Sequence, residues 1–416
     1  MYRPRIYSLI ILLVTTILCA NAVAQDLSRR GGFWVHQSER EFPAAAINKI
    51  HLSGFHGSLS VSVWTRDIVG LDMTLKMDVF TEKEARELAR ASEAAPQNQE
   101  GTLYLGGKTF NRNYLDCRLE LHVPARLSGH FQLATGDIEI NGLDGSVLAA
   151  TGVGELTIIN IGGAVKASTG AGEVEISEVD GDLIAESGAG EIEIRSITGD
   201  ADIRTGAGEI TVNDVAGMLM LSTGGGEIDV QNACMGLELT SGGGEITLTD
   251  MGGEITVDSG GGSIELADCK GNIRISTGGG SLEGRRVYGN LAMSTGGGDV
   301  DLSQISASLD ISTGGGDITV DMGFEETDTE FQMMLSTGGG GIDLGLPRLL
   351  PARIEALVRY RQRAWEDYEI DSDFPLAIEE REEGRYQIIE ARGQINNGKN
   401  LIQLKATSGD IRIRRH

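Results

Sequence analysis

The sequence contains little proline, few aromatic residues and few cysteines. Of its 416 residues only 7 are Pro, and Phe, Trp and Tyr together make up 5%. Any core must therefore be filled by aliphatic side chains, because aromatic rings are too scarce to fill one. Glycine is abundant, with 59 residues, about twice its average share. It shows no collagen period, and 40% hydrophobic residues is too many for a flexible Gly/Ser linker.

Basic residues are also scarce. The chain has 35 Lys and Arg against 61 Asp and Glu, which gives a formal net charge of −26. No nucleic-acid partner is expected, because binding to a phosphate backbone needs a basic surface.

The N-terminus has the pattern of a secretory signal peptide, residues 1–24. Arg3 and Arg5 precede an apolar run that ends at Cys19, and Ala22-Val23-Ala24 follows. This order is typical of a segment that is cleaved on export. The run is shorter than the roughly 20 residues of a membrane span. We expect cleavage after Ala24, export to the periplasm, outer-membrane surface or extracellular space, and no transmembrane segment in the mature chain.

The middle of the chain is an 18-residue repeat. The motif T/S-G-x-G-E/D begins at ten positions separated by equal intervals, although Ser263 and Ser281 replace the acid in two copies. The motif starts at Thr151, Thr169, Ser187, Thr205, Thr223, Ser241, Ser259, Thr277, Thr295 and Thr313. Self-similarity at a fixed period is the signature of a repeat architecture.

Aliphatic residues fall into three columns when the repeats are aligned. The first contains Ile138, Leu156, Val174, Ile192, Ile210, Ile228, Ile246, Ile264, Leu282, Val300 and Ile318. The second contains Val147, Val165, Leu183, Ala201, Leu219, Leu237, Ile255, Ile273, Leu291 and Leu309. The third, at the corner between two strands, contains Leu143, Ile161, Val179, Ile197, Val215, Cys234, Met251, Cys269, Val287 and Ile305. Each repeat holds two short segments of alternating polarity, which are typical of half-buried strands.

These columns predict an all-β fold, a single-stranded β-solenoid (β-helix) of about eleven 18-residue coils. One repeat cannot bury its apolar face alone, whereas a stack of repeats can. The glycine triplets would form sharp corners with positive φ. The Thr/Ser column beside them would point inward as a hydroxyl ladder, with simple corner packing as its favoured role.

Cysteine and histidine offer no strong site. The mature chain would keep Cys117, Cys234 and Cys269, an odd set that does not form a disulfide framework. Cys234 and Cys269 are expected two coils apart, beyond disulfide reach, as small buried hydrophobic residues. His51 and His56 are considered as a metal-binding pair, but a structural role is favoured.

The two ends depart from the repeat and are expected to cap it. Capping protects open strand edges, which otherwise recruit other chains. We assign residues 25–134 to a β-rich N-terminal cap, 135–345 to the repeat array, and 346–416 to a C-terminal cap with a closing coil. Thr81 and Glu84 form a capping box that predicts a helix over 81–94. The segment from Arg348 to Arg363 is expected to be strand.

The T-G-x-G-E-I-x-V units resemble those of the bacterial putative-adhesin family of exported β-strand-repeat proteins, a domain of unknown function. The runs Ser372-Asp373-Phe374-Pro375-Leu376 and Ala406-Thr407-Ser408-Gly409-Asp410-Ile411 also carry the resemblance. It covers roughly residues 45 to 416 and implies the solenoid fold and an exported protein. It implies no catalytic residue.

Nearly all the negative charge lies on the repeat array. Residues 135–322 contain 31 Asp and Glu against 7 Lys and Arg. The acids that follow the glycine triplets form one outward column, and a second column lies two residues further on. We single out the following as a candidate cation-binding face: Glu155, Glu173, Glu191, Glu209, Glu227 and Glu245. Calcium is the natural candidate, because it accepts carboxylate oxygens in flexible geometry, whereas the plainer alternative is a solvated face that keeps the protein soluble.

The sequence favours a non-enzymatic protein of the cell envelope or cell surface that presents an acidic face for binding or adhesion. Its partner would be an unidentified carbohydrate or protein, with no cofactor other than calcium. The alternative is a calcium-dependent carbohydrate-binding or polysaccharide-processing β-helix protein. An enzyme of that kind needs long loops around a cleft and one specialised acid pair, which even 18-residue repeats do not provide.

Overall fold

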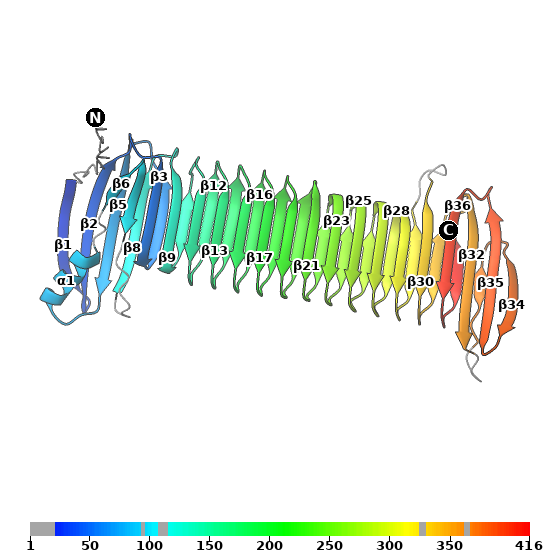
Figure 1. Cartoon of the computed structure of the whole chain (residues 1–416). Coiled ribbons are helices and arrows are strands. Elements are labelled where there is room, and N and C mark those ends of the chain that lie inside the picture. Colours follow the sequence, from blue (N-terminus) through cyan, green and yellow to red (C-terminus); the bar gives the residue numbers. More distant parts are fainter. Residues whose placement is uncertain (1–20, 93–95, 107–114, 324–329, 362–366) are drawn as a thin grey trace, which may run out of the picture. The chain divides into compact units, whose positions relative to one another are not determined.

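The computed structural model describes residues 21–92, 96–106, 115–323, 330–361 and 367–416. These residues form two compact units, one ending at Thr169 and the other beginning at Gly170. Each unit consists of stacked, mainly parallel strands (Figure 1), and the predicted β-solenoid is confirmed. The predicted boundaries of the caps and the array stay predictions, as does cleavage after Ala24, because residues 1–20 lie outside the described ranges.

The first unit has two sheets. Sheet 1 contains, in spatial order, β1 (Asn21–Arg30), β2 (Phe33–Pro43), β5 (Ile68–Met77), β8 (Leu115–Val123), β4 (Ser58–Val63), β10 (Ile138–Asn141) and β12 (Leu156–Ile161). Sheet 2 contains β6 (Gln97–Gln99), β7 (Thr102–Gly106), β3 (Lys49–His56), β9 (Ser128–Thr135), β11 (Val147–Thr151) and β13 (Val165–Thr169). The pairing is antiparallel towards β1 and β6 and parallel towards the repeats.

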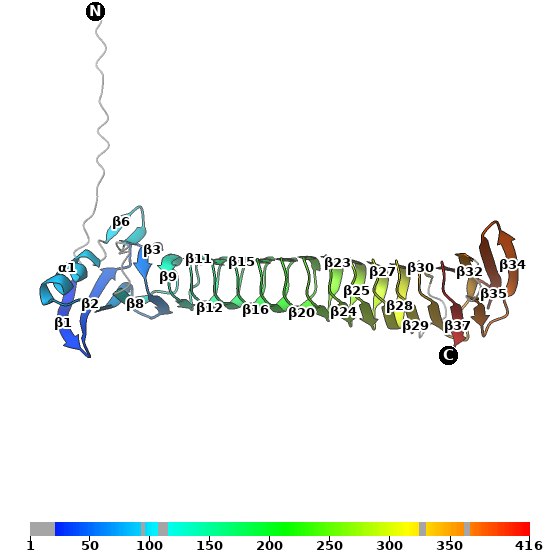
Figure 2. The same ribbon diagram turned by 90° about the horizontal axis from the view of Figure 1, so that it is seen from below.

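The second unit also has two layers of strands, here again named sheet 1 and sheet 2, which Figure 2 shows edge-on. Sheet 1 contains β14 (Val174–Val179), β16 (Ile192–Ile197), β18 (Ile210–Val215), β20 (Ile228–Ala233), β22 (Ile246–Thr249), β24 (Ile264–Ala267), β26 (Leu282–Arg285), β28 (Val300–Thr313), β29 (Ile318–Met322), β31 (Ile342–Leu346), β37 (Ile411–Arg415) and β33 (Ile370–Ser372). Sheet 2 contains β15 (Leu183–Ser187), β17 (Ala201–Thr205), β19 (Leu219–Thr223), β21 (Gly236–Ser241), β23 (Gly252–Ser259), β25 (Lys270–Thr277), β27 (Tyr288–Thr295), β28, β30 (Gln332–Thr337), β36 (Asn400–Ala406), β32 (Ala352–Arg361), β35 (Tyr386–Ile395) and β34 (Ala377–Glu383).

Each coil contributes one strand to each sheet and stacks in register on the neighbouring coils of its unit. Ile228 of β20 pairs with Ile210 and Ile246, and all three are 0% exposed. Leu219 and Leu237 stack in the same way in sheet 2 and are also buried. The first two predicted columns therefore form the core.

The third predicted column is correct except at one coil. The buried corner residue there is Ala233, which pairs in register with Val215, whereas Cys234 is exposed. The prediction of Cys234 as the corner residue is therefore wrong by one position, because Ala233 is the residue that keeps the 18-residue spacing from Val215. Cys269 does lie in the column, and burial raises the pKa of its thiol to about 11.

Each coil has a second sharp turn, at a residue with left-handed backbone conformation, which was not predicted from the sequence. Nine non-glycine residues, one in each of nine successive repeats, have φ between +53° and +60°: Asn160, Glu178, Ser196, Asp214, Asn232, Asp250, Asp268, Arg286 and Gln304. Each of these residues directly precedes a buried corner residue of the third column. Its left-handed backbone interrupts the alternation of the strand, so that two successive side chains point outward and the next one points inward. Asn and Asp tolerate this conformation best, but Glu178 and Arg286 show that packing imposes it on other residues.

The glycine corner is set by close contact between coils. Gly226 has φ of +125°, and a Cβ built on it would lie 2.1 Å from the carbonyl oxygen of Gly208.

The predicted hydroxyl ladder needs correction in one respect. Thr295 and Thr313 are buried, but their hydroxyls donate to the carbonyls of Gly280 and Gly298 at 2.8 Å rather than to each other.

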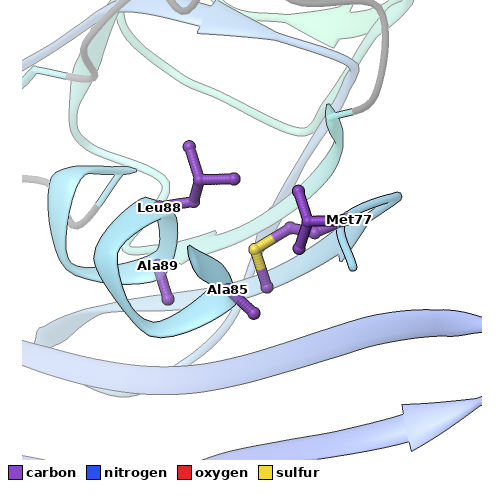
Figure 3. Close-up of a cluster of buried hydrophobic side chains, with 5 residues drawn as sticks. Met77, Ala85, Leu88 and Ala89 are labelled. Carbon is purple, nitrogen blue, oxygen red and sulfur yellow. The ribbon is translucent and has the colours of Figure 1, made fainter. Parts of the chain in front are cut away.

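A helix and an antiparallel hairpin complete the two units. Helix α1 (Glu82–Ser92) confirms the predicted helix, and the Glu84 N–H donates to the Thr81 hydroxyl at 3.2 Å. Its buried face, with Ala85, Leu88 and Ala89, packs against Met77 (Figure 3). In the second unit, β32 confirms the strand expected between Arg348 and Arg363. The closing coil, β36 and β37, stacks on β30 and β31 as predicted, but β32, β35 and β34 continue sheet 2 beyond it.

We expect Ile228→Asp to lower the free energy of unfolding by about 3 kcal/mol or more, because it buries an unpaired charge between Ile210 and Ile246. Urea unfolding followed by circular dichroism measures the effect. Glu227→Gln, one residue away and exposed, is the control and should leave stability unchanged or raise it slightly, because it relieves repulsion between like charges. Equal stability of Ile228→Asp and wild type would show that this column is not core.

Gly226→Ala and Gly225→Ala should differ sharply. A Cβ on Gly226 meets the Gly208 carbonyl, whereas one on Gly225 has nothing within 4 Å. We expect the melting temperature to fall by several degrees only for Gly226→Ala. Equal melting temperatures for the two variants would contradict the tight corner.

Candidate binding surfaces

The acids that follow the glycine triplets all lie exposed at the corner of the coils, as expected. Glu155 belongs to the first unit, and Glu173, Glu191, Glu209, Glu227 and Glu245 to the second. Within each unit, backbone carbonyls of this row accept hydrogen bonds from the preceding coil, for example from Ile210 N–H to Glu227 at 2.9 Å. In the parts of the chain that the structure describes, no group of three or more His, Cys, Asp or Glu converges as a metal site. The glutamates form an open row, and calcium binding stays a prediction.

Aspartates in the same corner column have a structural role. Asp299 Oδ1 accepts the N–H of Asp317 at 2.8 Å, and Asp317 Oδ1 accepts the N–H of Gly341 at 2.7 Å. The shorter Asp side chain reaches the next coil's backbone and satisfies a corner donor. These carboxylates therefore stabilise the corner itself.

The second acidic column is partly neutralised by arginines. Glu175 pairs in register with Glu193, and Arg195 forms ion pairs with both, at 3.5 Å to Glu175. At the other end, Arg414 of β37 lies 3.1 Å from Asp321 and 2.5 Å from Asp343. Asp343 and Asp321 hold the pKa of Arg414 above its usual value. The acidic face is thus interrupted by built-in cations.

A Ser–His–Asp row in the first unit has some features of a catalytic triad and was not anticipated. His122 Nδ1 lies 2.8 Å from Ser62 Oγ, and its Nε2 lies 3.8 Å from Asp72 Oδ2. The ring stacks on Trp64 at 5.3 Å. Burial, followed by the nearby Glu39, raises the pKa of Asp72.

This row lacks two features that nucleophilic catalysis requires. The distance from His122 to Asp72 is too long for a hydrogen bond. Strand β4 is also paired on both sides, by β8 and β10, so its backbone N–H groups serve the ladders and cannot form an oxyanion hole at Ser62. A structural role as a cross-strand polar row fits this geometry.

The structure does not bring His51 and His56 together. His51 Nδ1 lies 2.9 Å from His130 Nδ1, whereas His56 Nδ1 lies 3.0 Å from Thr135 Oγ1. Burial is the main cause that lowers the pKa values of His51 and His130. Each ring therefore has its own side-chain partner, which fits the structural role that the sequence favours. His130 was missed because it lies far from His51 in the sequence, on another strand.

A shallow groove of about 480 Å³ lies on sheet 2 of the second unit. Its outward polar lining consists of Glu254, Thr256, Asn272, Arg274, Asn290, Ser308, Asp310, Gln332 and Gln403. Asn290 Nδ2 donates to Asn272 Oδ1 at 2.7 Å, so the two amides form a short ladder. The sequence gives no periodic signal for this groove, because its lining residues differ from repeat to repeat.

Comparison with known proteins adds little. No protein-family model matches the chain, and neither does any curated protein. A crystal structure of a putative cell adhesion protein from Clostridium sporogenes is 9% identical, covers 91% of this chain and 99% of its own, and has a TM-score of 0.17. That of a putative adhesin from Bacteroides fragilis is 14% identical, covers 68% of this chain and 96% of its own, and has a TM-score of 0.23. At these TM-scores neither likeness supports an argument about this chain.

We expect millimolar calcium to raise the melting temperature more than sodium at equal ionic strength. Stacked carboxylates about 5 Å apart repel each other by roughly 1 kcal/mol in a water-like dielectric, and a divalent cation relieves that repulsion. Magnesium should help less, because it demands stricter geometry. Changing Glu173, Glu191, Glu209 and Glu227 to Gln should remove most of the calcium effect. Equal shifts with calcium and sodium would show that the acids only solvate the face.

Proposed function

We propose that this chain is a non-enzymatic exported protein of the cell envelope or cell surface, which binds other molecules through its sheet faces. One observation carries the proposal: equivalent outward side chains form in-register columns on the coils of the second unit. Glu175 pairs with Glu193, and Glu265 pairs with Glu283 and, through it, with Asp301. Such columns offer a partner many similar contacts at regular spacing, so weak individual contacts add up through multivalency.

The arrangement of polar groups supports a binding role over a catalytic one. Around Ser62, the backbone N–H groups of its own strand, β4, pair with the neighbouring strands β8 and β10 and are not available to an oxyanion. The acidic residues of the second unit form rows rather than one specialised pair. A labile substrate also needs a site that excludes water, whereas the acid columns lie open on the surface.

Export is proposed from the sequence of the N-terminus. The first 24 residues have the order of a cleavable signal peptide, and the part of β1 after Ala24 still pairs with β2 from Gln25 onward. Within the described ranges, no helix has the length and hydrophobicity needed to cross a membrane.

Carbohydrate binding is the second candidate function, and the groove on sheet 2 favours it. Its lining of amides, hydroxyls and a few charges matches the hydroxyl groups of a sugar chain better than the acid columns do. Polysaccharide processing would need a catalytic acid pair in that groove, and the acids Glu254 and Asp310 belong to coils three repeats apart.

Fractionation of native cells tests the proposed location. We expect the chain in the periplasmic, outer-membrane or medium fraction, with an N-terminus at Gln25 by terminal sequencing. Protease treatment of intact cells then separates a surface-exposed protein, which is cleaved, from a periplasmic one, which is protected. A full-length chain that fractionates with a cytoplasmic marker enzyme would overturn the proposal.

A further inference from the structure

We propose that the groove on sheet 2 of the second unit is a binding site for an uncharged, extended oligosaccharide. This inference deepens the proposed binding function and rests on it. Six consecutive coils line the groove, from the coil of Glu254 to the coil of Gln403. Its volume of about 480 Å³ falls in the range of ordinary ligand sites.

The groove exists because short side chains lie between long ones. One outward column runs from Arg274 through Ala292 and Asp310 to Met334 and Gln403. A neighbouring column runs from Asn272 through Asn290 and Ser308 to Gln332. Ala292 and Ser308 are the shortest members and form the floor, while Arg274 and the half-exposed Met334 rise at either side of Ala292 along the column.

The lining groups are suited to sugar hydroxyls. The amide of Asn272 donates and that of Asn290 accepts beyond their mutual hydrogen bond, so the ladder offers both functions to a ligand. Arg274 and Asp310 form no ion pair with any described residue, and are therefore free to bind hydroxyl groups. Amide, carboxylate and guanidinium groups can each contact adjacent hydroxyls of one ring in a bidentate manner.

The charge of the groove selects against acidic sugars. Its lining includes Glu254 and Asp310 but only one basic residue, Arg274. A polyuronate or sulfated chain would also meet the field of an acidic protein, whose formal net charge is −26. An uncharged chain escapes this repulsion.

The spacing of the coils favours an extended sugar chain. Equivalent side chains on successive coils lie about 4.8 Å apart, which is close to the advance of one pyranose unit along an extended chain. Each ring can therefore meet the same set of column positions, Asn272 or its equivalent on the next coil. Binding strength should then rise with chain length up to the extent of the groove.

An extended peptide fits this surface less well. Peptides usually bind a sheet by adding a strand to an open edge. Strand β25 is paired with β23 and β27, and β27 with β25 and β28, so no edge is open beneath the groove. Only side chains face the ligand, and the sugar's hydroxyls are the better match for them.

Titration calorimetry with cello-, chito- and manno-oligosaccharides, from disaccharide to hexasaccharide, tests the site on the full mature chain. We expect at least one series to bind, with affinity rising to the pentasaccharide or hexasaccharide. Asn290→Ala should weaken that binding roughly five- to tenfold, the effect of one hydrogen bond. Ala292→Trp, which fills the floor, should abolish it.

Ser222→Trp is the matched control, because Ser222 is an exposed outward residue of β19 in the same sheet but does not line the groove. It should leave oligosaccharide binding intact, and both Trp variants should melt like wild type. Absence of binding in all three series, stronger binding of an oligogalacturonate or an extended peptide, or unchanged binding by a folded Ala292→Trp variant would each overturn the inference. These outcomes concern the groove alone, whereas a cytoplasmic location would overturn the proposed function itself.

Discussion

In-register parallel hydrogen bonding between equivalent residues of successive repeats is the constraint on which the rest of the structure depends. It places each residue directly above its equivalent, so that Ile228 meets Ile210 and Ile246 and Gly226 meets Gly208. A side chain that packs well against its equivalent therefore stabilises every coil in which it recurs, and a side chain that packs badly destabilises every such coil. Register is kept even where the interval between repeats lengthens, since Thr313 still pairs with Thr337. The longer interval therefore does not shift the ladder.

The same constraint stacks like charges, and the chain relieves this in three ways. An arginine lies in the outward column beside the acids, as at Arg195, which contacts both Glu175 and Glu193. The final coil brings Arg414 against Asp321 and Asp343. Aspartate at the corner turns its carboxylate to a backbone N–H of the next coil, as Asp299 does. The glutamates that follow the glycine triplets have no arginine in their own column. External cations would therefore reduce the repulsion between carboxylates most strongly at this corner.

Periodic features could be predicted from the sequence, and features that depend on local geometry could not. The core columns, the glycine corner and helix α1 follow from patterns that identify buried or capped positions directly. The prediction of Cys234 as a corner residue is wrong, because Ala233, 18 residues after Val215, is the buried residue at that position. The left-handed residues opposite the glycine corner carry no common side chain, since Glu178 and Arg286 share only a backbone conformation. The pairing of His51 with His130 depends on which distant strands become neighbours, and that order is not encoded locally.

A solenoid of equal coils has a specific consequence for where function can reside. Where the outward residues repeat, the surface is uniform, and every position offers the same weak contact. A defined site arises only where successive coils differ, as Arg274, Ala292 and Asp310 do within one column. The constant spacing that identifies the fold therefore gives no signal for the groove, because the residues that line the groove do not recur from repeat to repeat. In this chain the groove is made by such departures, and the acid columns by the repeat itself. The proposed selective binding would therefore belong to the groove, and general electrostatic behaviour to the acid columns.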